Sequence, residues 1–161
     1  MELSELTAIS PIDGRYRSKL APLASFFSEY GLMRYRLKVE VEYLISLIAA
    51  LDAHFPDTYT SLAALDLAGL RSLYSEATFT AQEAEKIKAH EKVTNHDVKA
   101  VEYYLKDHIV SLASAEPTWN KVKEYIHFGL TSQDINNIAI PLLLRVCSFG
   151  VFLAVLLQPV G

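Results

Sequence analysis

Two short polar stretches contain the residue types from which a reactive site could be built. The first, residues 94–103 (TNHDVKAVEY), sets Asn95, His96 and Asp97 side by side. The second, residues 131–137 (TSQDINN), begins with two hydroxyls. Each falls where a helix is predicted to begin, and a helix start offers free backbone N–H groups and the positive end of the helix dipole. Anionic oxygens bind favourably there, and a neighbouring imidazole can transfer protons near neutral pH. The pattern indicates binding of a carboxylate-bearing substrate beside a proton donor or acceptor.

Both stretches also have a purely structural interpretation. His96 and Asp97 could form a surface turn in which the aspartate caps the following helix. Thr131 and Ser132 could serve only to cap the last helix, because hydroxyls are favoured at that position. Taken singly, neither stretch decides between a binding site and a helix cap.

Arg15 and Tyr16 form a third candidate, directly after the turn sequence of residues 10–14 (SPIDG). Proline and glycine are typical of tight turns, so the pair is expected to lie directly beside a rigid turn. The pair could be ordinary exposed residues. An arginine beside a rigid turn could also bind a phosphate or carboxylate through its planar fork of donors.

The spacing of the other candidate ligands does not predict a metal site. His90 lies six residues before His96, a separation that does not place two ligands on one face of a helix. We interpret His54 and His108 as structural. His54 lies at a predicted helix end, and His108 lies within the regular spacing of apolar residues of its helix. The single thiol, Cys147, is remote in sequence. We therefore expect no bound metal.

The composition predicts one globular domain of usual size. The chain has 161 residues, of which 51% are hydrophobic and 21% charged, with a formal net charge of −4. A net negative charge argues against a nucleic-acid partner. The single cysteine excludes an internal disulfide, and residues 1–14 lack the pattern of a secretory signal. These features favour a cytoplasmic location.

Hydrophobic periodicity predicts an all-α fold. A long helix is expected over about residues 28–54, where apolar residues recur at spacings of three and four. A short leucine-rich helix is expected within residues 62–74. Thr80 and Glu83 form a capping box that begins a helix running to about residue 92. No stretch alternates with a period of two for long enough to predict a strand.

Three further helices complete the predicted order. Asp97 is expected to cap a helix that ends near residues 116–117, and the next helix is expected over residues 119–128 with Gly129 as its stop. Thr131 or Ser132 is expected to begin the last helix. Its predicted inner face is formed by Ile135, Ile138, Leu142 and Val146. Pro141 lies inside this helix and is expected to kink it.

The end of the chain is unusually apolar. From residue 138 to residue 161 the only charged side chain is Arg145. The apolar run over residues 146–157 falls well short of the roughly 20 residues that a membrane span requires, so no membrane span is predicted. A helix that is apolar all round is expected to be buried within a helical bundle or at a subunit interface.

Taken in order, the three candidate segments resemble a known family. The bacterial-type adenylosuccinate lyases have motifs of similar sequence and spacing. The matching segments here are SPIDGRY over residues 10–16, TNHDVKAVEY over residues 94–103 and HFGLTSQDINN over residues 127–137. The resemblance covers roughly residues 1–145. It implies the all-α fold of the fumarase/aspartase superfamily, with an N-terminal helical domain over residues 1–116 and the start of the central helical bundle over residues 117–161.

The resemblance also implies a function. Members of this family cleave adenylosuccinate to AMP and fumarate, and the succinylated carboxamide ribotide of purine synthesis to AICAR and fumarate, by β-elimination. They act as homotetramers without a metal or an organic cofactor, and neither is expected here. By position, Arg15 and Tyr16 correspond to contacts with the phosphate end of the substrate. Asn95, His96 and Asp97 correspond to part of the pocket, with His96 in a supporting catalytic role, and Thr131 and Ser132 to donors for the succinyl carboxylate.

The sequence also departs from the family's pattern. It lacks the later Thr-His-Gly motif and the Ser-Ser-containing loop that supply the principal acid and base, and from about residue 146 an apolar run replaces an expected amphipathic helix. We therefore expect an incomplete, truncated part that is inactive by itself. Two alternatives stay open: another fumarate-forming lyase of the superfamily, or a non-catalytic helical fragment that associates with full-length subunits.

Overall fold

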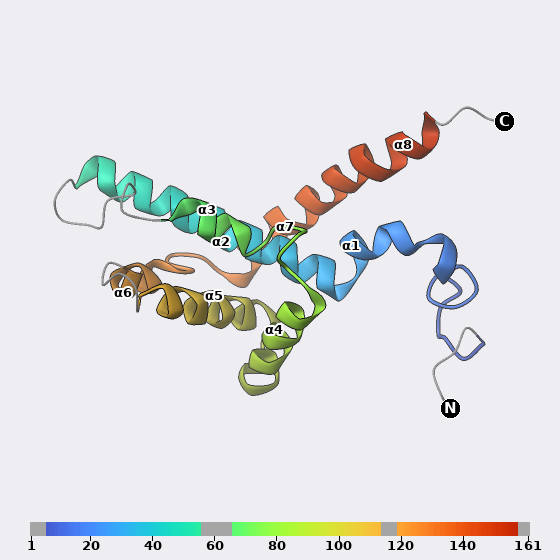
Figure 1. Cartoon of the computed structure of the whole chain (residues 1–161), viewed down its shortest axis with the longest axis horizontal. Helices are drawn as coiled ribbons and strands as arrows, with labels where there is room; N and C mark the ends of the chain where they lie inside the picture. The colour runs from blue at the N-terminus through green and yellow to red at the C-terminus, as the bar shows by residue number, and fades with distance from the viewer. Residues whose placement is uncertain (1–5, 56–65, 114–118, 158–161) are drawn as a thin grey trace.

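The computed structural model describes residues 6–55, 66–113 and 119–157 as an assembly of helices with no strand among them (Figure 1). The all-α prediction is confirmed. The α-helices are α1 (Ala24–Phe27), α2 (Glu29–His54), α3 (Leu67–Ser72), α4 (Ala81–Thr94), α5 (Asp97–Ala113), α6 (Trp119–Val122), α7 (Ser132–Cys147) and α8 (Leu153–Leu156). Short 3-10 turns η1 (Arg17–Lys19), η2 (Ala21–Leu23) and η4 (Lys123–Tyr125) and a π-helical turn η5 (Ser148–Phe152) connect them. The boundary expected at residue 116 lies outside the described residues, so the division into two domains stays a prediction.

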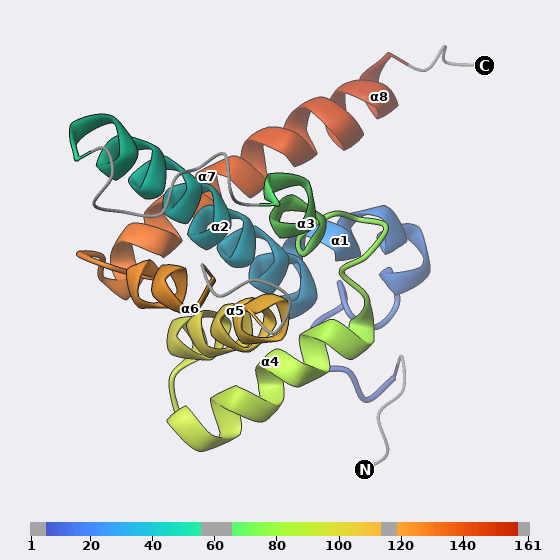
Figure 2. The same ribbon diagram turned by 60° about the vertical axis from the view of Figure 1, so that its left-hand side comes forward.

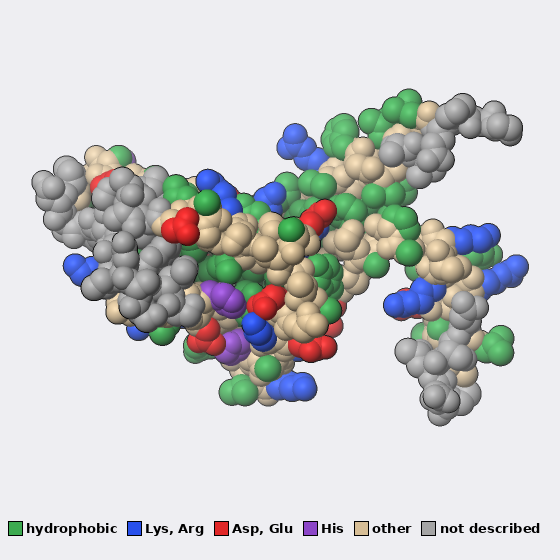
Figure 3. Space-filling view, in the orientation of Figure 1, with side chains coloured by type: hydrophobic (Ala, Val, Ile, Leu, Met, Phe, Trp, Pro, Cys, Tyr) green, Lys and Arg blue, Asp and Glu red, His purple; other side chains and the backbone are tan. Residues whose placement is uncertain are grey.

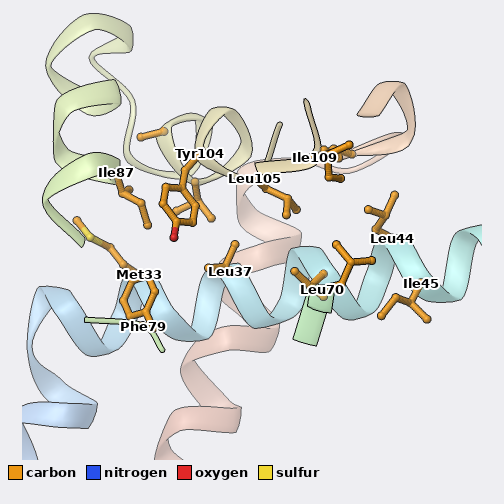
Figure 4. Close-up of a cluster of buried hydrophobic side chains, with 14 of the residues drawn as sticks. Met33, Leu37, Leu44, Ile45, Leu70, Phe79, Ile87, Tyr104, Leu105 and Ile109 are labelled. Carbon is orange, nitrogen blue, oxygen red and sulfur yellow. The ribbon is translucent and has the colours of Figure 1, made fainter. Parts of the chain in front are cut away.

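Helix α2 is the central element of the core. Its apolar side packs against α3, α4 and α5, and Figure 4 shows Leu37 and Leu44 pointing from α2 toward Tyr104, Leu105 and Ile109. Each of these leucine and isoleucine side chains is fully buried. Burying such a side chain contributes roughly 1.5–3 kcal/mol, so this cluster is the main source of stability.

Local capping explains the start of α2 but not that of α4. Ser28 caps α2, because its hydroxyl accepts the Gly31 N–H at 3.2 Å. Thr80 precedes α4 as expected, but its side chain makes no capping hydrogen bond, so the predicted capping box is wrong. The Glu83 carboxylate instead accepts from Lys86 Nζ at 2.7 Å and from the Tyr104 hydroxyl at 2.6 Å. A tertiary contact to α5 has replaced the local one.

The short helix expected within residues 62–74 is confirmed as α3, and residues 62–65 lie outside the described residues. The helix expected over residues 119–128 ends early, because the backbone is extended at Ile126 and left-handed at His127, with φ of 59°. Gly129 also has a positive φ, of 72°, which is the conformation expected of a glycine stop.

Helix α7 buries a different face from the one predicted. Its buried residues are Ile135, Ala139, Leu143 and Cys147, which pack against α1 and α2. Ile138 is 55% exposed and Val146 is 38% exposed, so the predicted inner face is wrong at these two positions. The helix continues through Pro141.

Within the described residues, the apolar end of the chain is largely left uncovered by the rest of the structure. Phe149, Phe152, Leu156 and Leu157 are all at least half exposed. Figures 1 and 3 show α8 projecting from the body with hydrophobic side chains on its surface. This chain by itself therefore does not bury the stretch, and the alternative of burial at a subunit interface stays a prediction. The stretch Ser132–Phe152 is long and apolar enough to cross a membrane, and its most apolar part is 22% buried. A single helix of this kind is weak evidence for a membrane span.

Candidate functional site

The turn between α4 and α5 is shaped by Asn95 and His96. Asn95 takes up a left-handed conformation, with φ of 51°, and ends α4. His96 then caps α5 with its ring: Nδ1 accepts the Lys99 N–H at 3.2 Å, while its carbonyl accepts the Ala100 N–H at 3.0 Å. The expected cap at Asp97 is wrong, because Asp97 is already the first residue of the helix.

His96 connects this turn to the start of α7. Its Nε2 lies 3.2 Å from the Ser132 hydroxyl oxygen, across 36 residues of sequence. Because Nδ1 accepts a hydrogen bond, the proton of the neutral imidazole belongs on Nε2, from which it donates to Ser132. The two polar stretches singled out in the sequence therefore meet at one place.

A buried arginine holds the two helix starts together. Arg36, on α2, is 9% exposed, and its Nη2 lies 2.7 Å from Asp97 Oδ2. Its Nε donates to Asn136 Oδ1, on α7, at 2.9 Å. Burial by itself raises the pKa of Asp97, but the hydrogen bond from the Val98 N–H and the Arg36 guanidinium outweigh that effect and hold the pKa below its usual value. Asp97 is thus a fixed anion that anchors the turn.

A second buried pair supports the loop before α7. His127 Nδ1 lies 2.5 Å from Glu40 Oε1, and the Glu40 side chain is fully buried on α2. Burial raises the pKa of Glu40, and the hydrogen bond with His127 opposes that rise. The Tyr43 hydroxyl donates to the Phe128 carbonyl at 2.7 Å. These contacts fix the loop in which His127 has its positive φ, and so the position of Ser132.

Thr131 and Asp134 bond to each other at the start of α7. The Asp134 carboxylate accepts from the Thr131 backbone N–H at 2.7 Å and from its hydroxyl at 2.8 Å. The backbone hydrogen bond is the main cause of the lowered pKa of Asp134. The Thr131 hydroxyl therefore donates within the protein, whereas the Ser132 hydroxyl accepts from His96 and retains its own proton for another acceptor.

Arg15 and Tyr16 lie apart from this place. Both side chains are exposed, and the Arg15 guanidinium lies over the Tyr16 ring, 5.4 Å from its centroid. In Figure 2 the segment that leads into α1 lies on the opposite side of the molecule from the lower end of α4, where Asn95 and His96 follow. The chain brings together the Asn95–Asp97 turn and Thr131–Ser132, and it does not bring the Arg15 turn to them.

The supporting residues Arg36, Glu40 and His127 were missed by the sequence reasoning. A signal for two of them was present, since Arg36 and Glu40 directly precede Leu37 and Val41 of the apolar stripe, and all four are buried. Charged residues are rarely buried unless paired, so each predicted a partner without identifying it. Among the described residues no group of three or more His, Cys, Asp or Glu side chains could hold a metal ion.

The arrangement is suited to one kind of chemistry. The Ser132 hydroxyl, whose proton is left available because its oxygen accepts from His96, lies at the start of α7 and can donate to a carboxylate and stabilise negative charge that develops on it.

The chain is similar to particular lyases over most of its length. It is 45% identical over 144 residues, 89% of the chain, to the adenylosuccinate lyase of Haemophilus influenzae. It is 44% identical over 90% of the chain to that of Escherichia coli K12, and 48% identical over 88% of the chain to that of Dictyostelium discoideum. A comparison with models of protein families found no match. The chain spans about 30% of the length of these relatives, consistent with their N-terminal portion. The chain is therefore homologous to one part of the adenylosuccinate lyases, which confirms the family resemblance.

Proposed function

We propose that this chain forms part of the substrate site for the cleavage of adenylosuccinate to AMP and fumarate, and of the related carboxamide ribotide to AICAR and fumarate. The observation that carries the proposal is the contact between His96 Nε2 and the Ser132 hydroxyl at 3.2 Å. It joins the two polar helix starts of the sequence at one place. The similarity to adenylosuccinate lyases supports the choice of substrate.

The proposed reaction is a β-elimination in which the residues of this chain bind and stabilise. A base takes the proton from the carbon beside the succinyl carboxylate, the C–N bond breaks, the C=C bond of fumarate forms, and the departing nitrogen takes up a proton from an acid. The intermediate places extra negative charge on that carboxylate. The Ser132 hydroxyl, which accepts a hydrogen bond from His96, donates a hydrogen bond to a carboxylate oxygen. This stabilises the added negative charge and lowers the barrier. His96 assists by polarising Ser132 and sharing the proton transfer.

The principal acid and base of the reaction are proposed to lie outside this chain. Arg15 and Tyr16 are proposed to bind the phosphate end of the substrate once further chain segments or subunits complete the site. Assembly as a homotetramer is part of the proposal, and the exposed apolar side chains of η5 and α8 support an assembled state. No cofactor takes part, and the reaction is placed in the cytoplasm.

Titration of the 161-residue chain with adenylosuccinate tests the proposal. We expect a saturable shift of the His96 imidazole NMR signals that Ser132→Ala abolishes. Ser46→Ala is the matched control, because Ser46 is an exposed hydroxyl on α2 that contacts only its own helix, through the Glu42 carbonyl. Absence of a shift, or equal behaviour of the two variants, would contradict the proposed site.

A second measurement tests the assignment of the acid and base. Loss of adenylosuccinate, followed by absorbance, is expected to be negligible with the pure chain. Robust turnover would show that the chain contains its own acid and base and would overturn that part of the proposal.

A further inference from the structure

A pocket lies on the side of α2 that carries Arg34 and Lys38, away from His96 and Ser132. It has a volume of about 250 Å³ and is lined by α2, by the turn that follows α3, and by Val146 near the end of α7. None of its lining residues belongs to the His96–Ser132 site. It is smaller than a typical site for a drug-sized ligand, which limits any occupant to a small molecule or ion.

The arginine that lines the pocket is buried beside a weak counter-ion. The Arg34 side chain is 7% exposed, and its Nη1 lies 2.9 Å from Glu76 Oε1. Glu76 is 76% exposed, so water competes strongly for its carboxylate. Arg34 Nε is buried and has no hydrogen-bond partner among the described residues. A buried guanidinium with an unused donor is costly unless an anion satisfies it.

The lining carries an excess of positive charge. Lys38 Nζ lies 5.6 Å from the centre of the Tyr74 ring, which also lines the pocket. The nearby Glu42 carboxylate is occupied by Arg71, through contacts of 2.7 and 2.9 Å, and by the Tyr74 hydroxyl. The two cations that line the pocket, Arg34 and Lys38, therefore face one lining carboxylate, which can swing into solvent.

We propose that this pocket binds a small oxyanion of the carboxylate or phosphate type. The anion accepts two parallel N–H bonds from Arg34, a geometry that a planar guanidinium favours, and pairs with Lys38 while Glu76 moves out. The proposal does not depend on the lyase reaction, because none of its residues contacts the His96–Ser132 site. It can therefore fail or succeed independently of the proposed function.

The test uses the whole chain, with sodium phosphate and sodium succinate as separate probes and sodium chloride at matched ionic strength as the reference. We expect a saturable shift of the Arg34 Nε–H signal in ¹H–¹⁵N spectra with at least one probe, and comparing the two identifies the preferred chemistry. Glu76→Gln is expected to tighten binding roughly two- to fivefold, since it removes the competing carboxylate. Lys38→Gln is expected to weaken binding roughly tenfold.

Lys92→Gln is the matched control, because Lys92 is exposed in the last turn of α4 and does not line the pocket. Arg34→Lys should abolish the two-point contact, and if that variant fails to fold, the Lys38 and Glu76 variants still decide the question. A response that grows linearly with either probe, equals that of chloride, or is the same in the Lys38 and Lys92 variants would overturn the proposal.

Discussion

The two helix starts at His96 and Ser132 differ sharply from the Arg15–Tyr16 turn in how the chain holds them. The helix starts are tied to α2 by buried charges: Arg36 bonds to Asp97 and Asn136, and Glu40 bonds to His127. The Arg15 side chain is exposed and contacts its neighbour Tyr16. All three segments carry the family resemblance, yet only two are positioned by the core of this chain.

This difference separates two ways of building a site. Where a polar turn is anchored by a buried charge, its geometry is fixed before any ligand binds, and less ordering is needed on binding. Where a turn has local contacts only, its position depends on what else the site is assembled from. Substitutions of the anchoring charges test whether these charges position the two helix starts.

The largest expected effect is that of removing the Arg36 side-chain charge. Arg36→Met should lower the free energy of unfolding by about 2 kcal/mol, because it removes a charged hydrogen bond to the half-exposed Asp97 and a hydrogen bond to Asn136. The matched change Arg15→Met should stay within about 0.5 kcal/mol, as an exposed substitution. Urea unfolding of the two variants measures the difference. Equal losses would remove the distinction between the anchored and the exposed arginine.

Glu40→Gln tests the buried pair through pH. Because the folded pKa of Glu40 is raised above the ordinary value of 4.5, the folded state binds this proton more tightly than the unfolded state. The free energy of unfolding should therefore fall as pH rises from about 4.5 through the raised pKa. In the variant that fall should disappear, with a stability change on the order of 1 kcal/mol. Unfolding curves across this pH range measure it, and an unchanged slope would contradict the assignment.

Asp97→Asn should act with the opposite sign. The folded pKa of Asp97 is below the ordinary value of 3.8, so its contribution is present above that pH and is lost as pH falls through the folded value. The variant should lose this acid-side decline and cost about 1 kcal/mol at neutral pH, less than the Arg36 variant because an amide oxygen can still accept from the guanidinium. Acid titration of stability, with Asp13→Asn on the exposed N-terminal turn as control, measures the effect.

The arrangement of helices was largely predictable, whereas the support of the site was not. The apolar stripe of α2 and the helix starts near Ser28 and Ser132 are local signals that predicted the observed features, whereas the stop at Gly129 was placed beyond the observed end of its helix. The pairing of Glu40 with His127 spans 87 residues and that of Arg36 with Asn136 spans 100, so no local pattern contains them.

Two errors have a clear physical origin. The buried face of α7 was misjudged because apolar residues lie on most sides of the helix from residue 138 onward, so more than one apolar stripe was consistent with the sequence. The cap of α5 was assigned to Asp97 because aspartate is a preferred cap, but a left-handed Asn95 places His96 at that position, and Asp97 is drawn to Arg36 instead. In both places a tertiary contact outweighed the local preference.

Ser132→Ala should have the smallest effect on stability, within about 0.5 kcal/mol, because the side chain is half-buried and its contact with His96 is open to solvent. Its effect on His96 should be specific, since the Nε2 proton loses its acceptor. The ring signals of His96 should shift, while those of His54, which bonds to the Ala50 carbonyl within its own helix, should not. Similar changes in both rings would indicate a global effect rather than loss of one contact.

The tautomer of His96 in the free 161-residue chain tests the central claim most directly. Long-range ¹H–¹⁵N spectra above the pH at which the ring is protonated distinguish a proton on Nε2 from one on Nδ1. We predict the Nε2–H form in the wild-type chain, with a loss of that preference in Arg36→Met, which releases the turn from the start of α7. An Nδ1–H ring, or a tautomer mixture that the Arg36 substitution leaves unchanged, would contradict a site positioned by the buried charges of α2.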